Sequence, residues 1–445
     1  MKTNIVTAVA IVVTLMFCSL FASTAQAVVP VANAPTWNQG DSWAMGKSVD
    51  LDAEFSQQLD QMQHMLENMT NATSIDEFQV KAMASIWLKV EVVTASAEEY
   101  VVRGKLAARF DAEATISVTG EMPAAGTRAF GDFNYPKTQR TVSVDISVET
   151  VFVSEMTIVF ERSTMAIKSI ETMNKASAIA SAKIMNIPEI KVNLSGITYS
   201  YRNIDFDLSF DMELNLGASF SPALNLIEFP LSVGDSWTVS SLASISGNVS
   251  GFLDIKGLSA SDKESLFGNS MLQNAGITDF PIDFSKLSTE NEPRIVNGTL
   301  MMADQYVNAT MECTGVELVT LPIFGEVAVY EITINGGSQK FYYSDDIKFL
   351  TGAGSSLDEF EMPVELGGIQ LPEAAVSLEP VTAQEAEQNI NSISAYQSDL
   401  SNQAGNFNGD GLGSLFSNVA IIGLIVVVVA LVAIVAVVVV KRKRK

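Results

Sequence analysis

The stretch from Ile204 to Leu216, IDFDLSFDMELNL, decides the fold class, because apolar and polar residues alternate along its whole length. A period of two residues is the pattern of a β-strand with one buried face. At this length the strand would extend over about 43 Å. Shorter alternating stretches lie at 86–92, 110–118, 142–148 and 327–334. The middle of the chain is therefore predicted to be mainly β and antiparallel, in an α+β arrangement with few helices.

Sequence patterns typical of turns and helices lie between and beside these predicted strands. The step from Ile334 to Gly337 predicts a tight hairpin, because its glycines supply the positive φ that such a turn demands. Apolar residues at helical spacing predict an amphipathic helix over 51–66 and a weaker one over 261–272. Thr382-Ala383-Gln384-Glu385 is a capping box, which predicts a polar helix running to about Leu400.

The two ends of the chain predict export and anchoring. Residues 1–27 have the basic start, apolar run and small-residue end of a cleaved signal peptide, with an uncleaved anchor as the alternative. Residues 419–440 are uninterrupted apolar sequence, long enough as a helix to cross a bilayer, and 441–445 form a basic tail. We therefore expect a type I single-pass protein of the cell membrane, whose ectodomain is extracellular and whose helix 419–440 contacts the lipid bilayer.

The ectodomain is predicted to hold two tandem domains, each a curved antiparallel sheet with a short helical insertion. We place them at 28–226 and 227–378, followed by a helical, Gly- and Asn-rich stalk at 379–418. The division rests on a repeated motif that uses two of the four tryptophans. It occurs as Gly40-Asp41-Ser42-Trp43 and again as Gly234-Asp235-Ser236-Trp237. In each copy the first three residues would form a turn and the tryptophan would open the next strand.

Composition excludes several functional classes. Without Lys2 and the tail 441–445, 21 of the 27 basic residues remain against 51 acidic ones, a net charge of about −30. Such an excess repels phosphate, so nucleic acid is excluded as a partner. One histidine and two cysteines exclude His-rich metal sites, Cys-rich zinc folds and a disulfide framework.

Candidate catalytic and metal-binding residues are few. His64 is the only histidine and lies on the polar side of the predicted helix 51–66, where a surface role is expected. Cys313, alone after signal cleavage, is expected to be buried, with a bridge between chains as the alternative. A Cu(I) ion could find soft ligands in Met62, Met65 and Met69 together with His64, although methionines on such a helix usually fill core gaps. We expect no catalytic residue, no cofactor and no resident metal, and an enzyme is the weakest of three functional readings.

Two acidic segments could attract cations. Asn406 to Gly411 resembles the start of a calcium loop but lacks its closing glutamate, since Ser417 stands there. The acidic row along 205–213 could also collect cations, although solvation of an exposed strand is the expected role.

Six glycosylation sequons are spread over the ectodomain, where they would mark solvent-facing positions. The candidate asparagines are Asn68, Asn71, Asn193, Asn248, Asn297 and Asn308.

One family resemblance adds to this interpretation. The segments 229–237, 317–324, 327–334 and 341–344 are together similar to exported proteins with a lipoprotein-carrier (LolA-like) half-barrel, chiefly over 228–375. The resemblance implies a curved antiparallel sheet around an apolar cavity partly closed by helices, and binding of an apolar ligand. The anchor and the acidic ectodomain also resemble archaeal surface proteins in style.

Two functional hypotheses follow. The first is a non-catalytic surface protein with a β-rich ectodomain that serves binding or surface display. Its concavity would hold a lipid or another apolar small molecule. The second is a structural or adhesive envelope glycoprotein with solidly packed domains, whose partners would be envelope proteins or divalent cations. The ligand-binding residues are not identified by the sequence.

Overall fold

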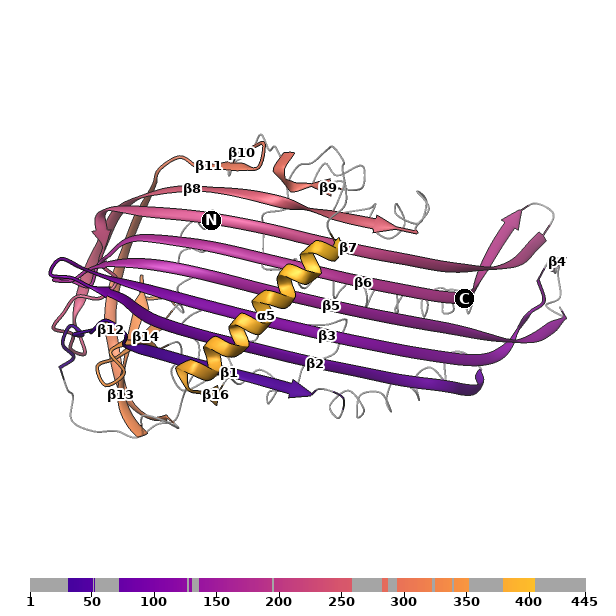
Figure 1. The fold of residues 1–445 in the computed structure, drawn as a ribbon, viewed down its shortest axis with the longest axis horizontal. Coiled ribbons are helices and arrows are strands. Elements are labelled where there is room, and N and C mark those ends of the chain that lie inside the picture. Colours follow the sequence, from indigo (N-terminus) through magenta and orange to yellow (C-terminus); the bar gives the residue numbers. More distant parts are fainter. Residues whose placement is uncertain are drawn as a thin grey trace.

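The computed structural model describes residues 31–50, 52, 72–125, 128–129, 136–193, 196–257, 282–286, 294–321, 325–337, 340–351 and 379–404. Over these ranges the protein is mainly β, as predicted: sixteen strands form one antiparallel sheet, and one long helix, α5 (Ala383–Ala404), lies on it (Figure 1). The long strands are β2 (Ala72–Ala95), β3 (Glu99–Pro123), β5 (Lys137–Glu161), β6 (Ile167–Asn193), β7 (Gly196–Leu224), β8 (Ser236–Lys256) and β12 (Gln305–Leu321). The shorter elements are β1 (Ser42–Asp50), β4 (Arg128–Ala129), β9 (Ile282–Asp283), η1 (Phe284–Lys286), β10 (Arg294–Val296), β11 (Thr299–Met301), β13 (Gly325–Ile334), β14 (Lys340–Ser344), β15 (Phe349–Thr351) and β16 (Glu379–Pro380).

The prediction of two separate sheets is wrong. The strand order is β15-β14-β13-β12-β8-β7-β6-β5-β3-β2-β1-β16, so strands from both predicted domains belong to one sheet. The predicted boundary at 226/227 falls between β7 and β8, which pair from Asp207↔Lys256 to Ser221↔Leu242. A long edge strand exposes unpaired backbone groups, and pairing β7 with β8 removes such an edge from the middle of the molecule.

The alternating stretch that predicted the fold lies in β7, which is 29 residues long and extends about 95 Å. Phe206, Leu208 and Phe210 are buried in one apolar cluster, on the face opposite α5. The helix packs on the other face, against Trp87, Ala107 and Val151. We call the face that carries α5 the outer face and the opposite one the inner face.

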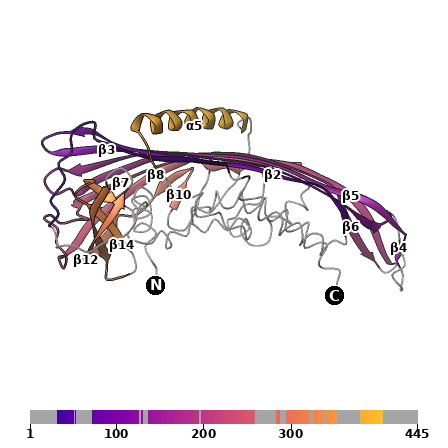
Figure 2. The same cartoon turned by 90° about the horizontal axis from the view of Figure 1, so that it is seen from below.

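The sheet is curved, and its inner face is concave. Figure 2 shows α5 above the convex side, while β12 and β14 turn downward at one end. There the two ends of the strand order come together. The indole N–H groups of Trp37 and Trp43 donate to the carbonyl oxygens of Lys348 (2.6 Å) and Ile347 (3.0 Å), in the turn between β14 and β15. We call this the closed end.

The core of the closed end is filled by aromatic and aliphatic side chains. Trp37 lies edge-on to Tyr100 and Phe160, with ring centroids 5.2 and 5.3 Å away. The same cluster draws on strands from β2 to β14, including the fully buried Ile332. A core shared by both halves of the chain is a second reason why they form one body rather than two.

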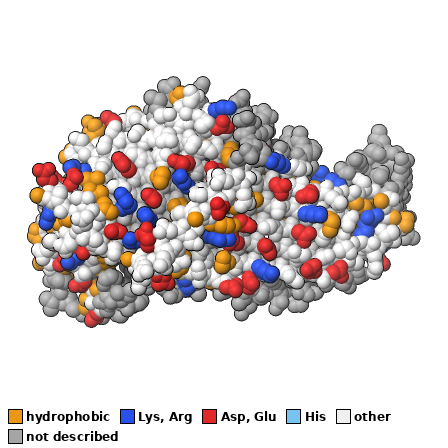
Figure 3. Space-filling model, viewed as in Figure 1, with side chains coloured by type: hydrophobic (Ala, Val, Ile, Leu, Met, Phe, Trp, Pro, Cys, Tyr) orange, Lys and Arg blue, Asp and Glu red, His pale blue; other side chains and the backbone are white. Residues whose placement is uncertain are grey.

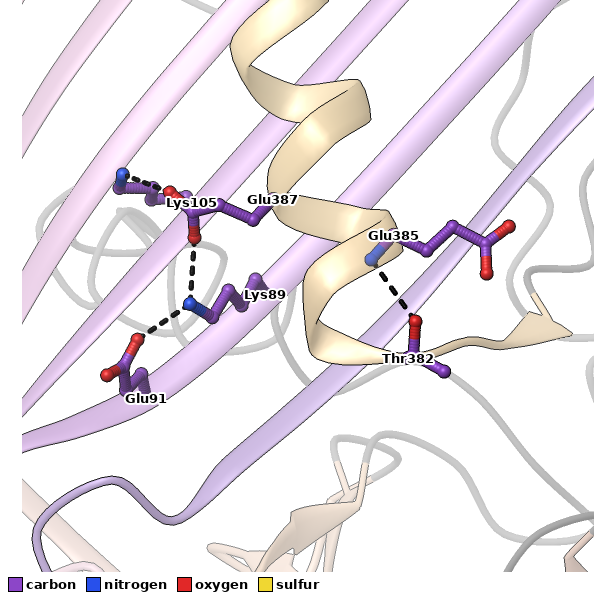
Figure 4. A network of polar contacts seen from close by, with 6 residues as sticks. All are labelled: Lys89, Glu91, Lys105, Thr382, Glu385 and Glu387. Carbon is purple, nitrogen blue, oxygen red and sulfur yellow. Dashed lines mark hydrogen bonds and ion pairs between the residues drawn. The ribbon is translucent and has the colours of Figure 1, made fainter.

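Two local predictions are confirmed. The hairpin at Ile334–Gly337 joins β13 and β14, and Asn335 and Gly336 adopt φ of 53° and 61°, as a tight turn between twisted strands requires. The amide of Glu385 donates to Thr382 Oγ1 at 3.2 Å, so the predicted cap starts α5 (Figure 4).

The helix is not a free stalk, however, because its apolar side packs on the outer face. Ile390 and Leu400 are 2% and 1% exposed there. In the described part of the chain no helix is both long and apolar enough to span a membrane. The predicted segments 1–27, 419–440 and 441–445 lie outside the described residues. So do the predicted helices 51–66, apart from Asp52, and 261–272, as well as residues 405–418 of the predicted stalk.

Candidate functional site

The inner face is a broad apolar surface. In its centre, four successive inward residues of β6 are alanines, and Ala178 lies in register between Thr150 of β5 and Phe210 of β7. These central side chains are buried, together with Phe284 of η1, whose ring meets Phe210 edge-on at 5.9 Å.

Away from this centre the inner face is less covered. Along β3 the inward side chains are half-buried apolar ones, and the same holds for the first part of β5. They are Phe110, Ala112, Ala114, Ile116 and Val118 on β3, and Val142, Val144 and Ile146 on β5. Apolar side chains that keep part of their surface accessible on a concave face can contact an apolar ligand.

Several buried polar groups interrupt this apolar face. Ser154 and Thr172 share side-chain hydrogen bonds with Asn174, but Thr150 differs. Thr150 is 6% exposed, and its hydroxyl has no hydrogen-bond partner among the described residues. A buried hydroxyl without a partner costs free energy, of the order of 1–3 kcal/mol. No sequence pattern marks this residue, because a threonine in an apolar strand is ordinary.

The two Gly-Asp-Ser-Trp segments adopt the same turn. Gly40 and Gly234 have φ of 94° and 93°. Asp41 accepts the amide of Asn38 at 2.8 Å, and Asp235 accepts that of Ser232 at 2.7 Å.

The strands that follow these turns also start alike. Ser42 opens β1 opposite Glu91 of β2, and Ser236 opens β8 opposite Glu312 of β12. The tryptophans differ in one respect: Trp43 binds the carbonyl of Ile347, whereas the buried Trp237 Nε1 has no partner among the described residues. In both copies the motif forms the turn from which a strand starts.

On the outer face, α5 is held by ion pairs as well as by apolar packing. Glu387 accepts hydrogen bonds from Lys89 (2.7 Å) and Lys105 (3.1 Å), and Lys89 also meets Glu91 at 2.7 Å (Figure 4). The hydrogen bond from Lys89 is the main reason why the pKa of Glu387 lies below its ordinary value. Burial disfavours the charged form of Lys89, but its two carboxylate partners outweigh this and raise its pKa.

A second polar cluster lies under the last turns of α5. The Arg109 guanidinium stacks on the Tyr396 ring, 3.6 Å from its centroid, and pairs with Asp111 at 2.7 Å. Tyr396 donates to Glu149. Burial, followed by this hydrogen bond, raises the pKa of Tyr396 to about 12. The stacking and the hydrogen bond fasten the helix to β3 and β5.

The acidic row along 205–213 lies on the outer face of a central strand. Lys183 stands opposite Asp205 and Lys256 opposite Asp207 in the register, and Lys175 lies 3.4 Å from Glu213. Figure 3 shows the same mixing of acidic and basic side chains over the outer face. Asp205 and Asp207 are exposed to solvent, but the row does not keep a strand edge from pairing, because β7 is paired on both sides. Among the described residues no group of three or more acidic, cysteine or histidine side chains is arranged to hold a metal ion.

Three of the sequon asparagines have described side chains, and all three are exposed: Asn248, Asn297 and Asn308. Asn193 ends β6, and its side chain is not described. Asn68 and Asn71 lie outside the described residues, as do His64, the three methionines beside it and the calcium-like segment 406–411.

Cys313 is fully buried, and burial raises the pKa of its thiol to about 11. This is the inert environment that the sequence favoured over an intermolecular bridge.

Comparison with known proteins identifies no relative. No family model matches the chain, no curated protein matches it, and no solved structure matches it.

Proposed function

We propose that this protein is a membrane-anchored surface protein that holds an apolar or amphiphilic small molecule against the inner face of its sheet. The observation that carries the proposal is the row of half-buried apolar side chains on β3 and β5, which line a concave face on the side opposite α5. The described residues offer no nucleophile and base pair beside this face, so the role would be binding rather than catalysis.

The export signal and the apolar segment 419–440 support an extracellular location with a single C-terminal membrane span. The LolA-like resemblance of the sequence over 228–375 implies the same class of ligand. This resemblance supports the proposal only as an analogy of shape, since fold does not determine function.

The test is mass spectrometry of an organic extract from the ectodomain, released from native membranes by cleavage in the 405–413 tether and purified without detergent. A lipid or isoprenoid at a stoichiometric level is the expected result. An extract free of such molecules would contradict the proposal.

A matched pair of variants shows where the ligand lies. Ile116→Trp adds bulk on the half-buried inner face, and Met83→Trp adds the same bulk at an exposed position, on the outer side of β2. We expect Ile116→Trp to lower the amount of extracted ligand severalfold and Met83→Trp to leave it unchanged. Equal amounts from both variants would place the ligand elsewhere.

The second candidate is a structural envelope glycoprotein. The observation that favours it is the exposure of all three described sequon asparagines, together with the tight burial at the centre of the inner face. An empty organic extract combined with sugar on these asparagines would favour this candidate over the first.

A further inference from the structure

Tyr306, on β12, is the most exposed of the large apolar side chains, with 76% of its surface accessible. Single exposed apolar residues are common and mean little alone. The exposure of Tyr306 is informative because of the residues beside it on β12.

Asn308 and Thr310 project from the same side of β12 as Tyr306. Val307, Ala309 and Met311 point into the core of the closed end, so the residues between them face outward, and all three outward side chains are exposed. Residues two apart on one face of a strand lie about 6.5–7 Å from each other. Asn308-Ala309-Thr310 is a sequon, so an aromatic ring stands directly beside a candidate glycosylation site.

The surroundings leave room for a sugar. On the neighbouring strand β8, Leu242 lies opposite Tyr306, Ser240 opposite Asn308 and Thr238 opposite Thr310. Ser240 and Thr238 are small, exposed and hydroxylated. β13 pairs with β12 only from Met311 onward. Asn335 also binds the backbone of Thr310, donating its amide to the carbonyl at 2.7 Å and accepting from the Thr310 amide through Oδ1 at 2.8 Å. In the described part of the sheet, the backbone of 305–309 is therefore paired on one side only, with β8.

The other two described sequons lack this arrangement. Asn248 lies in a strand that is paired on both sides, between Asn215 of β7 and Thr299 of β11. Asn297 is in the turn between β10 and β11, with φ of 48°. Among the described residues, no exposed aromatic ring lies beside Asn248 or Asn297 on the same strand face.

We propose that Asn308 carries an N-linked glycan whose first sugar packs on the ring of Tyr306. The donor would be an oligosaccharide linked to a lipid phosphate, present where exported chains emerge. The bond between the sugar C1 and the donor's phosphate oxygen breaks, C1 bonds to Asn308 Nδ2, one amide proton leaves, and the lipid phosphate is released. The C–H face of the attached sugar then covers the apolar face of the ring.

This inference rests on the extracellular location in the proposed function but not on the ligand. The first experiment is glycopeptide mass spectrometry of the full chain from its native membranes, with cell-surface labelling of the same sample. We expect a sugar mass on the Asn308 peptide that is lost in Asn308→Gln and kept in Thr310→Ser. A surface-labelled protein with bare Asn308 would overturn the glycan and leave the location standing, whereas a protein that no surface label reaches would overturn both.

The second experiment tests the contact with Tyr306. Enzymatic or chemical removal of the glycan should lower the unfolding temperature of the wild type and of Tyr306→Phe. The same treatment should change Tyr306→Ser less, because that variant has no ring for the sugar to cover. An equal drop in all three proteins would overturn the packing on Tyr306. Since position 306 is exposed, the variants are expected to fold.

Discussion

Gly40 and Gly234 carry the same backbone constraint at the start of β1 and β8. Both have φ near +94°, and an added Cβ would meet nothing within 4 Å at either position. Replacement by alanine should therefore cost only the strain of positive φ, about 1–2 kcal/mol, and should cost the same at both sites. Urea unfolding of the two single variants measures this.

Gly315 provides the control for these variants. It also has open space around it, but its φ is not positive, so Gly315→Ala should change the free energy of unfolding by less than about 0.5 kcal/mol. Unequal costs at Gly40 and Gly234 would mean that the two motifs are not structurally equivalent.

At the scale of the element, α5 acts as part of the sheet domain. Ile390 is almost fully buried against the outer face, whereas Asn391, the next residue, is exposed. Ile390→Ala should lower the free energy of unfolding by about 2–5 kcal/mol, and Asn391→Ala should leave it nearly unchanged. If chemical unfolding of the whole ectodomain gave equal stabilities for the two variants, the helix would behave as a free stalk after all.

The ion pairs of Glu387 give the attachment of α5 a pH dependence. Because the pKa of Glu387 is lower in the folded state than in the unfolded chain, its contribution is fully present above the unfolded value, near 4.3. It is lost as the pH falls through the folded value. The group is partly exposed, so the contribution should be no more than about 1 kcal/mol.

Stability curves against pH test this prediction. The difference between wild type and Glu387→Gln should be largest near neutral pH and should disappear in acid, below both pKa values. Glu385→Gln on the same turn is the control, because Glu385 is exposed and makes no ion pair that is described. A difference that stays constant down to pH 3 would show that charge at Glu387 does not matter.

The sequence predicted the existence and the start of α5 but not its docking. The buried positions, Ala386, Ile390, Ile393, Gln397, Leu400 and Ala404, follow a regular helical spacing of three and four. Two alanines and a glutamine among them dilute the hydrophobic signal, so the helix looked polar. Gln397 fits because it donates to Ser177 at 2.8 Å, a partner 220 residues away that no local pattern could reveal.

At the scale of the whole molecule, strand alternation predicted which face of each strand is buried but not which strands are neighbours. A period of two fixes the direction of a side chain, whereas the partner strand depends on contacts between distant segments. The repeated motif suggested a boundary at 226/227, and the register from β7 to β8 runs across it. The sequon at Asn308 shows the same limit: the sequence reveals its three letters, but not that the ring of Tyr306 beside it is exposed.

One continuous sheet has a thermodynamic consequence, since its two halves cannot unfold independently without exposing long strand edges. Leu208 of β7 lies in the first predicted domain, 28–226, and Ile332 of β13 lies in the second, 227–378; both side chains are buried. Leu208→Ala and Ile332→Ala should each lower the midpoint of the same calorimetric transition, because each removes buried methyl groups from one cooperative unit. If Ile332→Ala instead separated a second transition at lower temperature, the closed end would be an independent folding unit, and the two-domain prediction would hold for stability although it fails for structure.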